Sequence, residues 1–86
     1  MYRISFRSSF VRQYNNLEKA LQEEIIEKIE LLKDGINHKK LKVHKLHGHL
    51  GKYWSLSVNY RIRIVFYFES RKEIVLSLIG DHDIYK

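Results

Sequence analysis

Three side chains in the last third of the sequence are of types that bind and protonate phosphate groups. Arg61 and Arg63 alternate with apolar residues, so both guanidiniums are expected on the face opposite the apolar one. A guanidinium binds phosphate through paired hydrogen bonds and can stabilise charge in a phosphoryl-transfer transition state. His82 lies between Asp81 and Asp83 after an apolar run. Flanking carboxylates can orient an imidazole as a general acid; the alternative is a histidine that only satisfies a strand-end turn.

A stretch rich in lysine and histidine precedes these residues. His44, His47 and His49 have spacings of three and two, which invites a metal-site interpretation. A zinc site needs several deprotonated ligands held tetrahedrally, and the neighbouring lysines oppose a dication. The sequence has no cysteine, and no carboxylate lies near these histidines. We therefore predict no metal site; the alternatives for the three histidines are phosphate contact and exposure to solvent.

The positive charge of the chain is concentrated in residues 35–68, which contain seven Lys and Arg residues and no Asp or Glu. The whole chain has 16 basic and 10 acidic residues, so the remainder has nine basic and ten acidic ones. Such segregation predicts a binding surface for a polyanion such as nucleic acid. The alternative is a solvated basic face without a partner.

Hydrophobic periodicity indicates which elements position these residues. Residues 2–6 alternate between apolar and polar and predict a first strand. Residues 10–14 have a brief helical pattern, which Ser8 or Ser9 can cap. Residues 17–33 carry apolar side chains at spacings of three and four with glutamates opposite them, which predicts an amphipathic helix of about four turns.

The second half of the chain predicts mostly strand. Gly35 is suited to the C-cap of the amphipathic helix. Residues 36–52 have no clean period and are expected to form a loop with at most a short strand. Residues 54–58, 61–68 and 73–79 alternate and are separated by short polar turns, as in an antiparallel meander.

These elements predict one α+β domain over residues 1–86, with an N-terminal strand, a hairpin of two helices and a three-stranded antiparallel meander. The helices are expected to cover one face of the small sheet. The side chains expected on the covered face are Ile4, Phe6, Trp54, Leu56, Val58, Ile62, Ile64, Phe66, Ile74, Leu76 and Leu78. Those expected on the open face are Ser55, Ser57, Arg61, Arg63 and Tyr67.

Composition excludes several classes of protein. The absence of cysteine excludes disulfides and thiolate metal sites and fits a reducing compartment. The first residues lack the apolar core of a signal peptide, and no apolar run is long enough to span a membrane. We expect a cytoplasmic protein.

Three motifs together resemble the RelE/ParE superfamily, the toxins of bacterial type II toxin–antitoxin systems. They are residues 45–58, with Leu-x-Gly and a Tyr-aromatic-Ser strand; residues 60–66, with Arg-Ile-Val-aromatic; and residues 79–85, with Gly-x-His-Asp-x-Tyr. The resemblance implies a RelE-like fold and, as partners, a cognate antitoxin, the ribosome and messenger RNA. In the RelE and YafQ branches it implies a metal-independent endoribonuclease, an mRNA interferase. In these enzymes the ribose 2′-hydroxyl attacks the adjacent phosphate.

The resemblance also implies roles for individual residues. Arg63 matches the arginine that contacts the scissile phosphate, and His82 matches the catalytic histidine of YafQ-like toxins. Tyr85 matches the closing aromatic residue, and His44 matches a further active-site histidine. Arg61 has no secure counterpart in the family and is included for its own chemistry alone. The residues expected from their type and charge to bind RNA or phosphate are Arg61, Lys42, Lys45, Lys52, His47, His49, Ser55 and Ser57.

Ser55 and Ser57 stand where RelE-like toxins place lysines, so this strand supplies no cation. The general base is unassigned, with His44 as the best candidate. The alternatives are a ParE-like toxin that inhibits DNA gyrase without nuclease activity and a degenerate toxin that only binds its antitoxin. The presence of His82 and Arg63 favours the nuclease branch.

Overall fold

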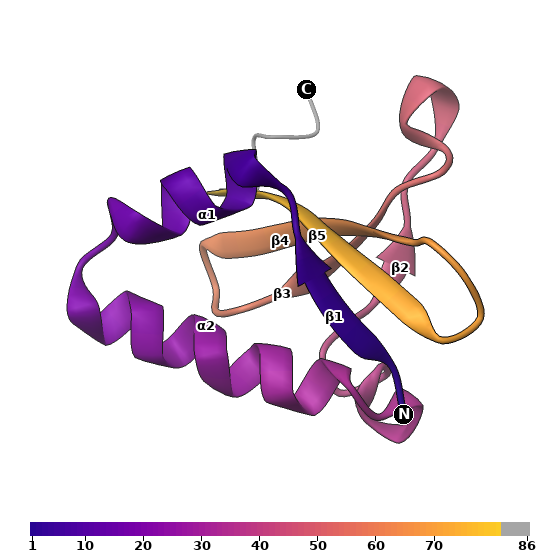
Figure 1. The fold of residues 1–86 in the computed structure, drawn as a ribbon, viewed down its shortest axis with the longest axis horizontal. Coiled ribbons are helices and arrows are strands. Elements are labelled where there is room, and N and C mark those ends of the chain that lie inside the picture. Colours follow the sequence, from indigo (N-terminus) through magenta and orange to yellow (C-terminus); the bar gives the residue numbers. More distant parts are fainter. Residues whose placement is uncertain (82–86) are drawn as a thin grey trace.

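Five strands form one open sheet in the computed structural model, which describes residues 1–81 (Figure 1). The elements are β1 (Arg3–Phe6), α1 (Ser8–Asn15), α2 (Lys19–Leu32), η1 (Gly35–Asn37), β2 (His44–Lys45), η2 (Gly48–Leu50), β3 (Trp54–Ser57), β4 (Ile62–Phe68) and β5 (Glu73–Asp81). The strand order is β1-β5-β4-β3-β2, with β1 parallel to β5 and the other pairs antiparallel. The predicted α+β class and the antiparallel meander are confirmed. The short strand β2 extends that meander at the other edge from β1.

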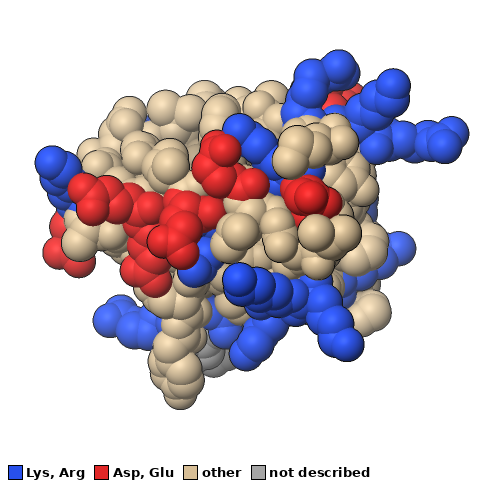
Figure 2. Space-filling model, turned by 90° about the horizontal axis from the view of Figure 1, so that it is seen from below, with Lys and Arg blue, Asp and Glu red and all other residues tan. Residues whose placement is uncertain are grey.

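The two helices lie together on one side of the sheet (Figure 1). Ile25, Ile29 and Leu32 recur along α2 at helical spacing and are buried against the sheet. The fully buried apolar side chains of the sheet are Leu56, Ile64, Phe66, Ile74 and Leu76. The glutamates of α2 face outward, and Figure 2 shows carboxylates gathered over part of one face with Lys and Arg around them. Among the helices of residues 1–81, none is both long and apolar enough to cross a membrane.

A β-bulge interrupts the pairing of β4 with β5. Val65 pairs with Leu78, but Phe66 pairs with Leu76, so Ser77 is an extra residue on β5. Before the bulge, the even-numbered residues Ile74 and Leu76 of β5 face the helices; beyond it, the odd-numbered Ile79 does. Leu78 is therefore 41% exposed and Ile79 only 6%, and the prediction that Leu78 belongs to the covered core is wrong.

The ends of the helices differ from the prediction. The N-cap of α1 is Arg7, whose guanidinium cannot accept a hydrogen bond, so its side chain does not cap the helix. Ser8 and Ser9 lie inside the helix, and the Ser9 hydroxyl donates to the Ser77 carbonyl at 2.7 Å. Gly35 does not adopt a left-handed C-cap conformation but begins η1. The residue after α2 is bonded to the residue before β1, since the Tyr2 N–H donates to the Lys33 carbonyl at 2.8 Å.

Candidate functional site

The face of the sheet opposite the helices carries the candidate site. Strand alternation places Ser55 and Ser57 of β3 on this face together with Arg63 and Tyr67 of β4. His44 of β2 is the pairing partner of Ser55 and joins the same face. Two of the predicted active-site residues, His44 and Arg63, are thus brought to one face of the sheet.

Arg63 is held at the end of the β3–β4 hairpin. Its backbone pairs with Ser57 on one side and with Gly80 on the other. Its Nη1 donates to the carbonyls of Asn59 at 2.8 Å and of Tyr60 at 3.3 Å, with a further bond to the carbonyl of its neighbour at 3.3 Å. In residues 1–81, no carboxylate lies within ion-pair distance of this guanidinium. Because these bonds use Nη1, the other nitrogens of the fork remain for an anion.

Asn59 organises the turn that holds Arg63. Its Oδ1 accepts from the backbone N–H of Arg61 at 2.9 Å and from that of Ile62 at 2.8 Å. A side-chain oxygen that accepts from the N–H two residues on is an Asx-turn, which asparagine favours. The sequence predicted a turn at this position, but it did not indicate that the turn would fix the guanidinium of Arg63.

Arg61 does not join Arg63. It precedes the first residue of β4 and lines a different hollow, together with Glu18 and Glu24 of the helical layer. The prediction that both arginines share the open face is therefore wrong. The physical reason is that residue 61 belongs to the turn, where the alternation of a strand does not apply.

Both ring nitrogens of His44 form hydrogen bonds with described residues. Nδ1 lies 3.0 Å from the Lys42 carbonyl, and Nε2 lies 3.2 Å from the Ser55 hydroxyl. Because a carbonyl only accepts, we assign the proton of the neutral ring to Nδ1, which leaves Nε2 as the basic nitrogen. Ser55 has no exposed surface with which to contact RNA, and its hydroxyl instead supports His44.

A cationic and aromatic group lies elsewhere on the open face. Lys52 Nζ is 4.8 Å from the centroid of the Tyr67 ring and 5.3 Å from that of Tyr53. Arg7 donates to the Tyr67 hydroxyl at 3.4 Å, and this hydrogen bond raises the pKa of Arg7 above its usual value. Lys52 was among the predicted RNA contacts; Arg7 was missed because its partner is 60 positions away in the sequence.

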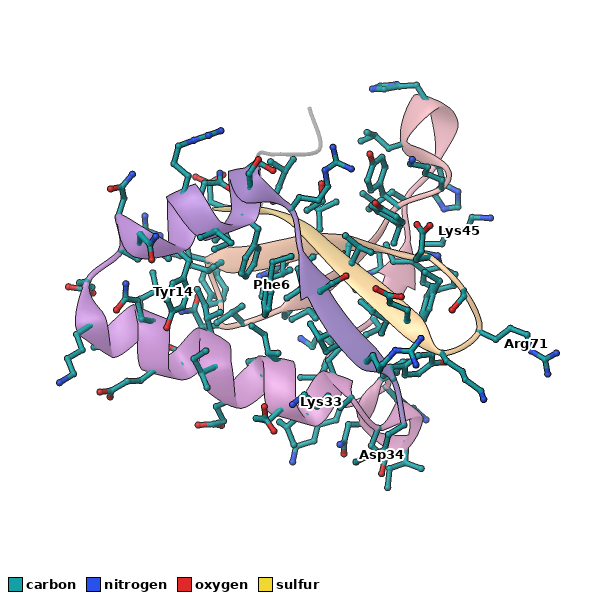
Figure 3. The ribbon with its side chains drawn as sticks, viewed as in Figure 1. Phe6, Tyr14, Lys33, Asp34, Lys45 and Arg71 are labelled. Carbon is teal, nitrogen blue, oxygen red and sulfur yellow. The ribbon has the colours of Figure 1, made fainter. Side chains whose placement is uncertain are left out.

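The remaining predicted contacts are more dispersed. Lys45 pairs with Trp54, so strand alternation directs it away from the face that carries His44; it is labelled in Figure 3. His47 and His49 are exposed in the β2–β3 connection, which extends away from the sheet (Figure 1). Within residues 1–81, no group of three histidine, aspartate or glutamate side chains is arranged to hold a metal ion.

Two of the predicted catalytic residues, His82 and Tyr85, lie outside the described residues. The described part of β5 ends at Asp81, which pairs with Ile62, and the preceding Gly80 pairs with Arg63. Their roles therefore stay predictions.

The carboxyl-terminal half of β5 is held by α1, which sequence reasoning missed. Strand β1 ends at Phe6, opposite Leu76. Beyond that point, Gln13 Nε2 donates to the Ile79 carbonyl at 2.8 Å, and Gln13 Oε1 accepts from the Ile79 N–H at 2.8 Å. This amide takes the place of a neighbouring strand and fixes the segment that passes Arg63. The sequence contained one indication of this contact: Ser9 and Gln13 are four residues apart, which places both polar side chains on the same face of a helix.

Comparison with known proteins supports the fold. No protein-family model and no curated protein matches the chain by sequence. Solved structures do match: RelE in the archaeal RelE–RelB complex from Pyrococcus horikoshii has a TM-score of 0.75 at 20% identity, covering 96% of this chain and 97% of that one. A chain of the YoeB–YefM complex from Staphylococcus aureus has a TM-score of 0.75 at 20% identity, with 95% and 98% covered. A point mutant of YafQ from E. coli has a TM-score of 0.67 at 15% identity, with 96% of each chain covered. The predicted RelE-like fold is confirmed.

Proposed function

We propose that this chain is a RelE/ParE-superfamily toxin of a type II toxin–antitoxin pair and that it cleaves messenger RNA on the ribosome. The observation that carries the proposal is the guanidinium of Arg63, which projects from the open face of a RelE-like sheet without a carboxylate partner among the described residues. A cation held in this way is available for the phosphate of a polyanion. The uneven charge of the chain supports the same substrate class, because residues 35–68 carry no acidic side chain.

The proposed reaction is an internal transesterification. His44 Nε2 exchanges its hydrogen bond with the Ser55 hydroxyl for one with the ribose 2′-hydroxyl and takes that proton, and the 2′-oxygen attacks the adjacent phosphorus. The bond from phosphorus to the 5′-oxygen breaks, and His82 protonates that oxygen. The products are a 2′,3′-cyclic phosphate and a 5′-hydroxyl. Arg63 stabilises the charge that develops on the phosphoryl oxygens, and Tyr85 stacks on a base. None of these steps needs a metal ion.

The test induces the protein in bacteria and measures two quantities: the cleavage of messages and the supercoiling of DNA. The proposal predicts growth arrest with messages cleaved within coding regions, and loss of both effects in His82→Ala. The alternative, a ParE-like inhibitor, predicts stalled gyrase with intact messages. Expression without growth arrest would refute both and leave a chain that only binds its antitoxin.

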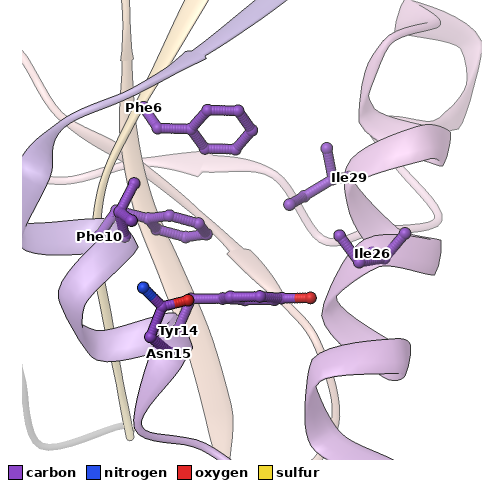
Figure 4. Close-up of a pocket in the computed structure, with 7 residues that line it drawn as sticks. Phe6, Phe10, Tyr14, Asn15, Ile26 and Ile29 are labelled. Atoms are coloured by element: carbon purple, nitrogen blue, oxygen red, sulfur yellow. The ribbon is translucent and has the colours of Figure 1, made fainter. Parts of the chain in front are cut away.

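We further propose that the antitoxin covers an apolar groove between the helices (Figure 4). The groove has a volume of about 250 Å³, and the rings of Phe6, Phe10 and Tyr14 face Ile26 and Ile29 across it. Phe6 and Ile26 are about half exposed in this groove, and exposed apolar side chains that lie together mark a protein-binding surface. Strand β1 lies at the edge of the sheet beside the groove, so its outer edge can also accept an added strand.

A charge placed in the groove tests this partner site. Ile26 is 46% exposed in the groove, whereas Ile36 is 84% exposed outside it. Ile26→Asp is expected to weaken binding of the antitoxin at least about tenfold, because the substitution buries a charge against aromatic rings when the antitoxin binds. Ile36→Asp, the matched control, should bind as the wild type does. Equal binding by both variants would place the antitoxin elsewhere.

A further inference from the structure

A cationic hollow of about 390 Å³ lies beside Arg63. We define it by the polar side chains that line it: Lys28, Lys40, Lys42, Ser57, Asn59 and Arg63. None of the described residues that line the hollow is a carboxylate, and four of them are cationic. The hollow is large enough to hold a small ligand, and its lining selects an anion.

The loop that carries Lys40 and Lys42 is fixed to the sheet. Leu41, between them, is buried, and its carbonyl accepts from the Ser57 N–H at 2.9 Å. Lys42 adopts a left-handed backbone conformation, with φ of 58°, which is uncommon for a side chain of this size. Its carbonyl is bonded to His44 at 3.0 Å. The segment that carries the two lysines is therefore hydrogen-bonded to β3 through Leu41 and to β2 through Lys42.

The four cations are not equivalent. Lys28 Nζ lies 3.2 Å from Glu27 Oε1, so its charge is partly neutralised. For Lys40 and Lys42, no ion pair is formed with any described residue. Ser57 is neutral at a place where the family resemblance implies a lysine. Lys40 and Lys42 thus bring positive charge from a neighbouring loop to a strand that has none of its own.

We propose that the cationic hollow is a subsite for one backbone phosphate of single-stranded RNA, bound by Lys40 and Lys42 next to the phosphate that Arg63 contacts. This inference rests on the proposed function, because it takes RNA as the substrate. It adds a positioning role for Lys40, which no sequence motif indicated. It also explains how the strand with Ser55 and Ser57 can serve a polyanionic substrate without lysines.

Binding of an uncleavable RNA tests the subsite. The probe is a fluorescent eight-nucleotide 2′-O-methyl oligouridylate, whose blocked 2′-oxygens prevent cleavage, and its affinity is measured by anisotropy over a range of salt. The test variant is Lys40→Gln with Lys42→Gln. The control is Lys19→Gln with Lys72→Gln, which removes the same charge from exposed positions outside the hollow.

Loss of one phosphate contact lowers the slope of log affinity against log salt by about 0.7 for a single strand, or about fivefold in affinity at 0.1 M salt. We expect the test variant to show at least this loss relative to the control variant. Equal affinities and slopes for the two variants would overturn the subsite.

Ribosome-dependent cleavage by the wild type separates the two proposals. If the wild type cleaves messages and the two variants bind RNA equally well, the subsite is refuted and the proposed nuclease activity stands. If only the test variant binds RNA weakly and the wild type leaves messages intact, the proposed nuclease activity is refuted and the subsite stands.

Discussion

Gln13→Ala tests whether α1 holds the end of β5 in place. The amide of Gln13 forms two hydrogen bonds, both 2.8 Å long, with the N–H and the carbonyl of Ile79. Ile79 is 6% exposed, so alanine at position 13 would leave two backbone groups unsatisfied in a nearly dry environment. Each such group costs about 1–3 kcal/mol.

Water can enter the space left by the half-buried amide, so we expect values near the lower end of that range for each group. The free energy of unfolding should fall by about 2–4 kcal/mol. For a domain of this size, that corresponds to a melting temperature lower by roughly 10–25 °C. Because the same strand carries Gly80 beside Arg63, cleavage should also weaken at temperatures where the variant is folded.

Urea denaturation followed by circular dichroism measures this loss. Gln22→Ala is the matched control, because Gln22 forms a single side-chain bond, to the Tyr14 carbonyl at 2.8 Å. We expect the control to lose about 1 kcal/mol. A loss in Gln13→Ala no larger than that of the control would refute the reasoning that the amide replaces a strand.

Two further predictions concern the residues that hold Arg63 and His44. Asn59→Ala should lower the free energy of unfolding by about 1–2 kcal/mol, because two backbone N–H groups lose their acceptor. Asn59→Asp keeps the acceptor oxygen, so its free energy of unfolding should stay within about 0.5 kcal/mol of the wild-type value. Similar losses in both variants, measured by urea denaturation, would contradict the turn described here. Ser55→Ala should cost only about 0.5–1.5 kcal/mol and should lower kcat for cleavage more than it changes KM, since His44 loses the bond that orients Nε2. An unchanged kcat would exclude this role for Ser55.

The sequence predicted those features that depend on local periodicity. Alternation located β3, β4 and β5, and helical spacing located α2. It did not predict the bulge at Ser77, because the pattern of one strand contains no information about an extra residue relative to its partner. Leu78 was misplaced for that reason, and Arg61 was misplaced because the boundary between turn and strand is not visible in an alternating run.

The candidate site could be predicted only in part from the sequence. Motif resemblance indicated Arg63 and His44, whose residue types are informative by themselves. The supporting contacts join distant positions: Gln13 and Ile79 are 66 residues apart, and Arg7 and Tyr67 are 60 apart. Such pairs depend on sheet order, and the parallel pairing of β1 with β5 cannot be read from either strand alone.

Cleavage of a reporter message on purified ribosomes, by the wild type and by Arg63→Gln, tests the central proposal most directly. Glutamine removes the charge and the planar fork, so the rate of cleavage should fall roughly 100-fold or more, as when an oxyanion ligand is lost. Urea denaturation of both proteins should show that the variant is folded under the conditions of the assay. The proposal predicts cut messages with the wild type and intact messages with the variant. Equal cleavage by both proteins, or an intact message with the wild type, would contradict it.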